Sequence, residues 1–312
     1  MSARELRAQR AIGAPRRTYA CLEGRQRKPS DYEITTTGLL YYPARGFEVE
    51  TPVSRHHQAQ QAGKLRCPDW DAFEDPAHTT YSSYVAARRD QEALLDYLFR
   101  APAVPLSHEL GPLLGLVSAL RFPLHGLQMT SAYVGALAPG GRIAVASALQ
   151  AADELRRIQR LCQWLWRSGK SAQALDQAGR ELWQSHQALQ PLRRVIERLL
   201  VTYAWEEALV ALNGVLKPTL EPLLVERLGA FAARHGAELL SQSLGSFASD
   251  ATWHGAWFER LERLLCDAEP GNAEVFAAVR QRLGPEVLEA CETMLTALGI
   301  APNEGSSLAD AT

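Results

Sequence analysis

The feature of the sequence that most constrains the fold is the helical spacing of its apolar residues, which begins at about Tyr81 and continues almost to the end of the chain. An apolar stripe along one face of a helix has to be covered by a neighbouring helix. No stretch alternates apolar and polar residues between turn signals, as a half-buried strand would. We therefore expect an all-α fold. Two clear stripes are Leu192, Ile196, Leu199, Leu200 and Tyr203, and Leu288, Cys291, Leu295 and Leu298.

Proline and glycine predict where these helices begin and end. Pro123, Pro191 and Pro218 stand where a proline in the first turn of a helix is common. Pro139-Gly140-Gly141 and Gly284-Pro285 are typical of breaks between helices.

The first 80 residues have a different composition. They are rich in Pro, Gly, Thr and aromatic residues and show little apolar periodicity. A segment of this length without regular structure is unusual inside a compact domain, and its aromatics are too many to leave in water. We predict an extended, interface-forming arm over residues 1–80, packed on the body or on a partner chain. A helical domain over 81–300 and a mobile tail over 301–312 follow it. The aromatics of the arm are Tyr32, Tyr41, Tyr42, Phe47, Trp70 and Phe73.

Composition and charge exclude several classes of function. With 46% apolar residues, 22% charged residues and a formal net charge of -2, the chain is typical of a globular protein without a general attraction to nucleic acid. Eight basic residues lie within the first 28, but no apolar region follows them, so they do not form a secretory signal. The Pro, Gly and Tyr content of this basic arm favours a protein partner over nucleic acid or a membrane surface.

Cysteine and hydropathy patterns indicate a cytoplasmic, membrane-free protein. The five cysteines stand far apart, without a C-x-x-C pair, which is typical of reduced thiols. No window approaches the roughly 18 apolar residues that a bilayer-spanning helix needs. The cysteines are Cys21, Cys67, Cys162, Cys266 and Cys291.

A helical body of this size invites a search for the di-iron carboxylate arrangement, in which two helices each carry a Glu-x-x-His motif. None of the eight histidines has Glu three places before it; the single carboxylate, Asp75 before His78, precedes Pro76 and is not expected on a helix. Two stretches come close. Glu154 has Arg157 in the His position, and His254 has Ala251 in the Glu position. Because a guanidinium has no lone pair for a metal, Arg157 would instead neutralise Glu154.

Each of these near-misses also has an ordinary structural explanation. Glu154 and Arg157 are spaced like an ion pair on the surface of a helix. His254, between Trp253 and Trp257, has the surroundings of a packed histidine. Other catalytic signatures are missing: the sequence has no G-x-S-x-G elbow and no complete phosphate-binding loop, and Ser168-Gly169-Lys170-Ser171 follows a helical run rather than a strand.

Several blocks of residues, in one order along the chain, together carry a resemblance. They include Arg27-Lys28-Pro29-Ser30-Asp31-Tyr32-Glu33, residues 69–76, residues 124–134, and the pairs Leu212-Asn213 and Lys217-Pro218. On these blocks the chain resembles the β subunit of the hydroxylase component of bacterial multicomponent monooxygenases, the toluene, phenol and alkene monooxygenase group. The resemblance runs from about residue 27 to residue 218 and continues more weakly to about residue 265.

The resemblance implies a ferritin-like helical bundle that duplicates the catalytic α subunit without its iron. It implies an (αβγ)2 hydroxylase with β–β contact, in which the di-iron centre belongs to the α subunit and this chain holds no cofactor. An effector protein, a ferredoxin and an NADH-dependent reductase would complete the system, which hydroxylates aromatics or epoxidises alkenes with O2. The degenerate ligand positions implied for this chain are Gln128, Glu154, Arg157, Ala251 and His254.

Two other hypotheses remain open at this point. One is an active ferritin-like di-iron oxidase with unusual ligands, namely Glu92, Glu154, Glu207 and His254. The other is a helical interaction protein that works without hydroxylase partners.

Overall fold

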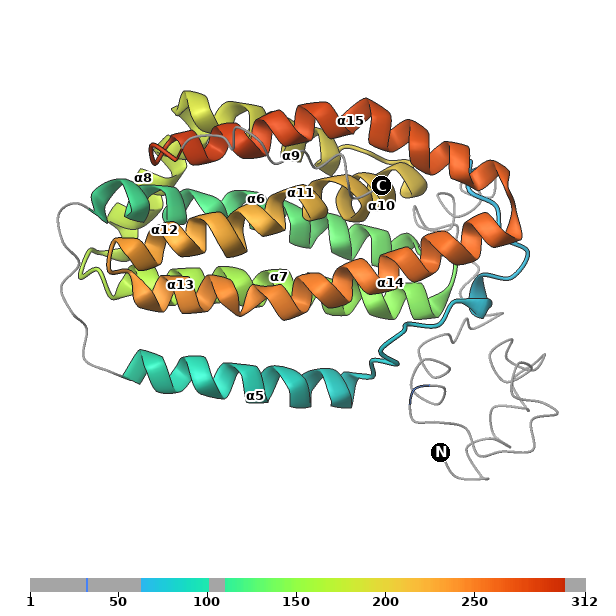
Figure 1. Cartoon of the computed structure of the whole chain (residues 1–312), viewed down its shortest axis with the longest axis horizontal. Helices are drawn as coiled ribbons and strands as arrows, with labels where there is room; N and C mark the ends of the chain where they lie inside the picture. The colour runs from blue at the N-terminus through green and yellow to red at the C-terminus, as the bar shows by residue number, and fades with distance from the viewer. Residues whose placement is uncertain (1–31, 33–62, 101–109, 301–312) are drawn as a thin grey trace, which may run out of the picture.

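The computed structural model describes residue 32, residues 63–100 and residues 110–300, and all regular structure in these ranges is helical (Figure 1). The prediction of an all-α fold is therefore confirmed. The long helices are α5 (Tyr81–Arg100), α6 (Gly111–Leu137), α7 (Gly141–Trp166), α8 (Ala172–Ser185), α9 (Gln190–Leu200), α14 (Phe247–Ala268) and α15 (Gly271–Thr296). Short 3-10 turns are η1 (Trp70–Ala72) and η3 (Gln187–Leu189).

One continuous helical stretch, Trp205–Arg234, contains two π-helical segments. It consists of α10 (Trp205–Ala211), the π-helical segment η4 (Leu212–Leu216), α11 (Lys217–Pro222), the π-helical segment η5 (Leu223–Leu228) and α12 (Gly229–Arg234). The short helix α13 (Glu238–Gly245) then leads into α14. π-Helical turns often mark functional sites, because each inserts a residue and redirects the side chains that follow.

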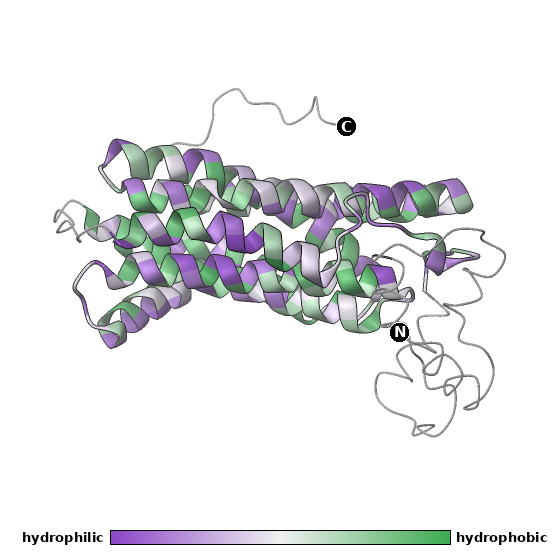
Figure 2. Cartoon of the chain, turned by 90° about the horizontal axis from the view of Figure 1, so that it is seen from below, coloured by the Kyte–Doolittle hydropathy of each residue, from purple (hydrophilic) through white to green (hydrophobic). Residues whose placement is uncertain are grey.

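The hairpin of α6 and α7 lies at the centre of the bundle (Figure 1). Helix α6 packs on α7, α8 and α9; α15 packs on α9 and α10; α14 packs on α7, α11 and α13. Helix α5 lies along one edge, beside the α7 and α13–α14 layer. Hydrophobic and hydrophilic residues alternate along the helices, as expected where each helix buries one side (Figure 2).

Proline predicted some helix boundaries correctly and others wrongly. Pro191 lies in the first turn of α9, and Gly140 is the N-cap of α7 after the Pro139 break. Pro218 begins the segment α11 but lies within the continuous stretch Trp205–Arg234, so no helix begins there. Pro123 and Pro285 also lie inside helices, namely α6 and α15. Apolar residues on both sides of each proline are buried, so packing against neighbouring helices keeps these two helices continuous.

The apolarity of Trp205–Arg234 also differs from expectation. This stretch is long and apolar enough, by composition, to cross a membrane, which contradicts the prediction that no such stretch exists. In the structure 72% of its most apolar window is buried inside the protein. The stretch crosses the bundle, so its apolar residues contact other helices.

The described part of the N-terminal arm packs on the bundle. Tyr32 is buried, and its hydroxyl accepts a hydrogen bond from the backbone N–H of Asp75 (3.1 Å). Phe73 is fully buried against Trp257, with ring centroids 6.4 Å apart. The side chain of Trp253 donates to the Asp75 carboxylate (3.1 Å). Of the predicted arm aromatics, Tyr41, Tyr42 and Phe47 lie outside the described residues, as does the predicted tail 301–312.

Candidate functional site

Helix α7 carries charged side chains into the interior of the bundle. Asp153, Glu154 and Arg157 are at most 1% exposed, and Arg156 and Arg160 are also buried. Residues spaced three or four apart lie on the same side of a helix, and this side of α7 faces α5, α11 and α14. Because a buried charge is costly unless it is paired, the partners of these residues define the site.

Two carboxylates and two cations form the centre of this site. The Lys217 ammonium contacts a carboxylate oxygen of Glu154 and lies 2.6 Å from Oε1 of Glu221. Nη1 of Arg157 lies 2.7 Å from the same Glu221 oxygen and 3.2 Å from Oε1 of Glu154. The carboxylates come from α7 and α11, so four charges hold these two helices together.

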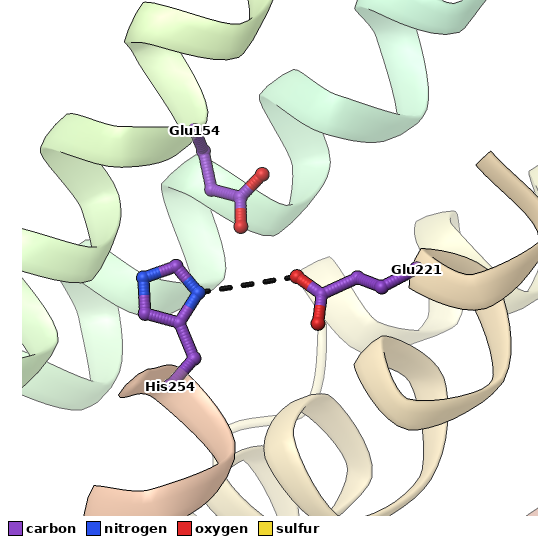
Figure 3. A group of neighbouring side chains, drawn as sticks. All are labelled: Glu154, Glu221 and His254. Carbon is purple, nitrogen blue, oxygen red and sulfur yellow. Dashed lines mark ion pairs between the residues drawn. The ribbon is translucent and has the colours of Figure 1, made fainter. Parts of the chain in front are cut away.

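His254 of α14 closes the third side of the centre, where it faces Glu154 and Glu221 (Figure 3). Its Nδ1 lies 3.9 Å from Oε1 of Glu221 and has no hydrogen-bond partner among the described residues. Its Nε2 lies 3.1 Å from Oδ2 of Asp153. Asp153 also accepts from the Tyr84 hydroxyl (2.8 Å) and from Nε and Nη2 of Arg88 (2.6 and 2.9 Å).

Helix α5 is attached to the site largely through charges. Arg88 lies 3.0 Å from the Asp250 carboxylate of α14 in addition to its bonds with Asp153. Glu92 accepts from Arg156 (2.8 Å) and from Arg160, and Arg156 also contacts Asp250. The buried apolar residues of α5 are Leu95 and Phe99, so its ion pairs make up much of its contact with the bundle.

The electrostatics of the site keep both kinds of charge ionised. Burial alone would raise the pKa of the Asp153 carboxyl, but hydrogen bonds from His254 and Arg88 outweigh it and hold this pKa well below its usual range. Burial would likewise raise the pKa of Glu221, yet the charges of Lys217 and Arg157 lower it. Burial would lower the pKa of Arg157, but the carboxylates of Glu154, Glu221 and Asp250 raise it.

The geometry partly matches the ligand set of a di-iron carboxylate centre. One ligand atom each from Glu154, Glu221 and His254 lie within 4.8 Å of one another, and the three residues come from three helices of the bundle. In ferritin-like di-iron proteins two helices supply a single Glu and two supply Glu-x-x-His. By residue type alone, Glu221 resembles the single Glu, Glu154 the Glu of one motif, and His254 the His of the other.

The residues nevertheless do not fit a metal centre. Lys217 and Arg157 both lie against the Glu154 and Glu221 oxygens that would bind the ion, and neither cation can donate a lone pair. The donors that remain are already neutralised by the protein itself.

The structure brings together three of the five predicted ligand positions, Glu154, Arg157 and His254. Gln128 is half-buried on α6, and no hydrogen bond or ion pair of the described residues joins it to this cluster. Ala251 is also only half-buried. The buried carboxylate of α14 comes from the preceding residue, Asp250, which is four places before His254 rather than three.

The ligands of the alternative di-iron hypothesis are not brought together. Glu92 is engaged by Arg156 and Arg160 on the α5 side of the network. Glu207 pairs with Arg282 (2.5 Å) and is partly exposed. Neither residue therefore joins Glu154 and His254.

Sequence reasoning missed Lys217, Glu221 and Asp250. A usable signal was present: Asn213, Lys217 and Glu221 recur every four residues in a helix that is otherwise strongly apolar. Polar residues at this spacing lie on one side of the helix. Because the helix is buried, they need polar partners on the neighbouring helices. Asn213 accepts from Gln150 of α7 (2.9 Å), next to the charged centre along the same pair of helices.

Comparisons with known proteins agree with this architecture. The family described as Methane/Phenol/Alkene Hydroxylase matches residues 51–269. The β subunit of the hydroxylase component of a toluene-4-monooxygenase system from Ectopseudomonas mendocina is 29% identical over 304 residues, covering 91% of each chain. The oxygenase component DmpL of a phenol 2-monooxygenase from Pseudomonas sp. (strain CF600) is 28% identical over 241 residues, covering 72% of this chain and 70% of the relative.

Solved structures show the same fold. A chain of toluene 4-monooxygenase, solved with toluene bound in its resting active site, superimposes with a TM-score of 0.78 at 28% identity, over 92% of this chain and 99% of the other. A chain of phenol hydroxylase from Pseudomonas sp. OX1 gives a TM-score of 0.80 at 20% identity, over 92% and 89%, which supports the fold alone. The resemblance seen in the sequence is confirmed, and the chain belongs to the methane/phenol/alkene hydroxylase family.

Proposed function

We propose that this chain is the non-catalytic β subunit of a di-iron monooxygenase hydroxylase, which hydroxylates aromatics or epoxidises alkenes with O2 and NADH-derived electrons. One observation carries the proposal: Lys217 and Arg157 lie on the two carboxylates that would otherwise bind iron. The chemistry then belongs to a partner α subunit with a di-iron centre, and this chain holds no cofactor. The relative named as a hydroxylase β subunit covers nearly the whole chain, which supports this assignment.

The proposed assembly is an (αβγ)2 hydroxylase in the cytoplasm. The chain would contact the catalytic α subunit, a small γ subunit and a second β chain, and an effector protein, a ferredoxin and a reductase would serve the same system. The described cysteines, Cys67, Cys162, Cys266 and Cys291, are all free thiols, as expected in a reducing compartment.

The outer face of α6 and α7 is a suitable surface for the catalytic subunit. Met129, Leu155 and Trp166 are 47%, 50% and 79% exposed on this face. Ala132, Ala136, Gly141 and Ala148 line a shallow groove between the two helices. Small residues allow a partner helix to approach closely, and the exposed apolar side chains gain from being covered. We expect Leu155→Arg to reduce the yield of co-purified α subunit, while Glu259→Arg on the exposed side of α14 leaves it unchanged.

We also propose the division of the chain into an interface-forming arm (1–80), a ferritin-like body (81–300) and a mobile tail (301–312). The buried Tyr32 and Phe73 support an arm that is anchored on the body at its described end. A deletion of residues 1–62 spares Leu65 and Phe73, which belong to the core. This deletion should lower the yield of assembled hydroxylase while the far-ultraviolet circular dichroism of the chain stays strongly helical. An unchanged yield would contradict the role of the arm.

The central test is metal analysis of the separated subunits. We expect the full chain, expressed in iron-rich medium, to contain no stoichiometric iron and to consume no O2 with a chemical reductant. The co-expressed α subunit should contain about two irons. If the isolated chain contained about two irons and reduced O2, the proposal would be wrong and an active oxidase would replace it.

A further inference from the structure

We infer that the uncharged outer side of α7 is covered by a long helix of the α subunit, which packs along α7 from Ala148 to Trp166 at a small crossing angle. The inference deepens the proposed function and rests on it, because it specifies which element of the α subunit the outer face of α6 and α7 receives.

Helix α7 distributes its charges the opposite way from a helix that faces water. The structure describes this helix throughout: all six of its charged residues are buried, and none of its six exposed residues is charged. A helix at the surface of a soluble protein normally turns its charged residues toward the solvent. The buried set is Arg142, Asp153, Glu154, Arg156, Arg157 and Arg160. The exposed set, here called the outer line of α7, is Ala148, Ala152, Leu155, Gln159, Cys162 and Trp166.

The other long helices show that this inversion is not general in the protein. Helices α5, α8, α9, α14 and α15 each expose Asp, Glu, Lys or Arg, for example Glu259 and Arg263 of α14. Helix α6 exposes none of these four residue types, and its exposed residues include Met129, Ala132 and Ala136. Among the long helices of the described residues, only the pair α6 and α7 therefore presents a face without charge.

The outer line of α7 is straight. Its successive members are four, three, four, three and four residues apart, which is the spacing of a seam that runs almost parallel to the helix axis. From Ala148 to Trp166 the line is roughly 27 Å long, at a rise of about 1.5 Å per residue. A partner helix covers this length only at a crossing angle near about 20°, because helices that cross at about 50° separate within a few turns.

The sizes of the residues along the outer line suit a partner helix. At one end Ala148 lines the groove between α6 and α7 together with Ala132 and Ala136, so the backbone of a partner can approach closely. In the middle Leu155 is 50% exposed, and at the other end Trp166 is 79% exposed. Apolar side chains of this size gain when they insert between the side chains of a partner.

The partner helix must carry uncharged residues where it meets the outer line. The charges of α7 are already paired inside the bundle, as Arg156 is with Glu92 and Asp250. They cannot serve as counter-ions on the outer side, so a charged side chain of the partner would be buried there without a pair.

A second copy of this chain is the competing occupant, and the distribution of charge favours the α subunit. Obligate interfaces are more hydrophobic than transient ones, and their cores are depleted of charged residues. If a second copy covered α6 and α7, the α subunit would have to bind long described helices that expose charges. The uncharged face therefore suits the permanent contact with the α subunit.

The native thiol of Cys162 lies on the outer line and reports whether this line is covered. The full-length chain is alkylated with iodoacetamide, alone and in the hydroxylase co-purified with the α subunit, and each cysteine is quantified by peptide mass spectrometry. Cys266 of α14 is the internal reference. We expect the ratio of the Cys162 rate to the Cys266 rate to fall at least about tenfold in the complex, because a covered thiol reacts more slowly. An unchanged ratio would overturn the inference.

A cysteine at the opposite end tests whether the partner lies lengthwise. Ala148→Cys places a thiol at the start of the outer line, and it should be protected in the complex to the same degree as Cys162. Protection of only one of the two thiols would show that the partner crosses α7 steeply, and the lengthwise helix would be wrong.

Two isosteric substitutions test the requirement for an uncharged face. Gln159→Glu adds a charge to the outer line without changing the shape of the side chain, and Gln281→Glu does the same on the exposed side of α15. Each variant is co-expressed with the wild-type chain and a limiting amount of α subunit. We expect Gln159→Glu to be under-represented in the purified hydroxylase by at least about tenfold, because its carboxylate is buried without a partner. Gln281→Glu should be represented equally, and equal representation of both variants would overturn the inference.

The outcomes separate this contact from the proposed function. If the wild-type chain recovers no α subunit, the proposed function fails. If it recovers the α subunit while Cys162 stays as reactive as in the isolated chain, only the contact along α7 fails. If the isolated chain forms a dimer in size-exclusion chromatography and already protects Cys162, a second copy occupies the face and the inference is overturned. The alkylation of Cys162 needs no substitution, so it decides the question even if a variant folds poorly.

Discussion

Helices α6 and α7 are antiparallel neighbours of 27 and 26 residues, yet only α7 buries charged side chains among its apolar ones. The buried residues of α6 carry no charge at all. Those of α7 include Arg142, Asp153, Glu154, Arg156, Arg157 and Arg160. Burial of apolar area is non-directional, so α6 can pack on three helices without a specific partner for each side chain. The buried charges at residues 153–160 of α7 need partners, and α5, α11 and α14 supply groups of the opposite charge.

The comparison shows how differently the two helices respond to change. When an apolar side chain of a buried helix is removed, the free energy of unfolding falls by roughly the contribution of that side chain. For a buried ion pair, removing one member lowers the free energy of unfolding more than removing both. The member that is left behind is then a buried, unpaired charge.

The largest effect is expected from Arg157→Leu, which leaves Glu154, Glu221 and Asp250 short of one cation. We expect a loss of about 3–5 kcal/mol in the free energy of unfolding, measured by urea denaturation at pH 7. Arg263→Leu, on the exposed side of α14, should change it by less than about 0.5 kcal/mol. A loss below about 1 kcal/mol for Arg157→Leu would mean that the α7 charges do not hold the bundle together.

On the apolar helix, Leu127→Ala should cost about 3 kcal/mol, because a fully buried leucine leaves a cavity. The cost should be the same at pH 7 and pH 5, since no charge is involved. A cost that varied with pH between these values would remove the distinction between the two helices.

Predicting the fold from sequence succeeded where apolar periodicity determines the structure. The stripes of α9 and α15 predicted buried helix faces, and Leu192, Ile196, Leu199, Cys291 and Leu295 are buried. Leu200 and Tyr203 of the first stripe are 39% and 69% exposed, so that stripe ends at Leu199. Prediction failed at Pro123 and Pro285, because packing from distant parts of the chain outweighs the local preference to end a helix.

Prediction of the site from sequence was limited by the ambiguity of charges. Glu154 and Arg157, three residues apart, look the same in sequence whether they face water or the interior. The partners that show this pair to be buried, Lys217 and Glu221, are 60 or more positions away. They reach Glu154 and Arg157 only through the packing of α11 on the bundle. Asp250 was missed because it lies four residues before His254, where the search required three.

A smaller effect is expected for the pH dependence of the stability that Asp153 contributes. The native pKa of Asp153 is depressed, so its carboxylate contributes stability above the unfolded pKa of about 3.9, and this contribution is lost as pH falls through the native value. Asp153→Asn should therefore be about 2 kcal/mol less stable than the wild type at pH 7, with the gap narrowing below pH 4. Glu259→Gln changes an exposed position of α14, and its stability should depend on pH in the same way as that of the wild type. If the stability difference between Asp153→Asn and the wild type stayed constant with pH, the charge of Asp153 would not contribute to stability.

The smallest effect is expected when both members of a buried pair are removed together. Lys217→Met/Glu221→Gln keeps the side-chain volumes and leaves Glu154 paired with Arg157, so its stability should lie within about 1 kcal/mol of the wild type. Each single change should cost more than the double one, and a double-mutant cycle measures this coupling. Additive costs would show that the two residues stabilise the bundle independently.

The placement of Lys217 and Arg157 has a consequence for the order in which an assembly of this kind is made. In a protein whose carboxylates await a metal, folding is coupled to the supply of that metal. Here the counter-ions are encoded in the chain, so the charge balance of the interior is complete as soon as the helices pack. A subunit built this way reaches its final shape when iron is scarce. Under the proposed function, this subunit would offer a completed surface to an α subunit that still lacks its iron.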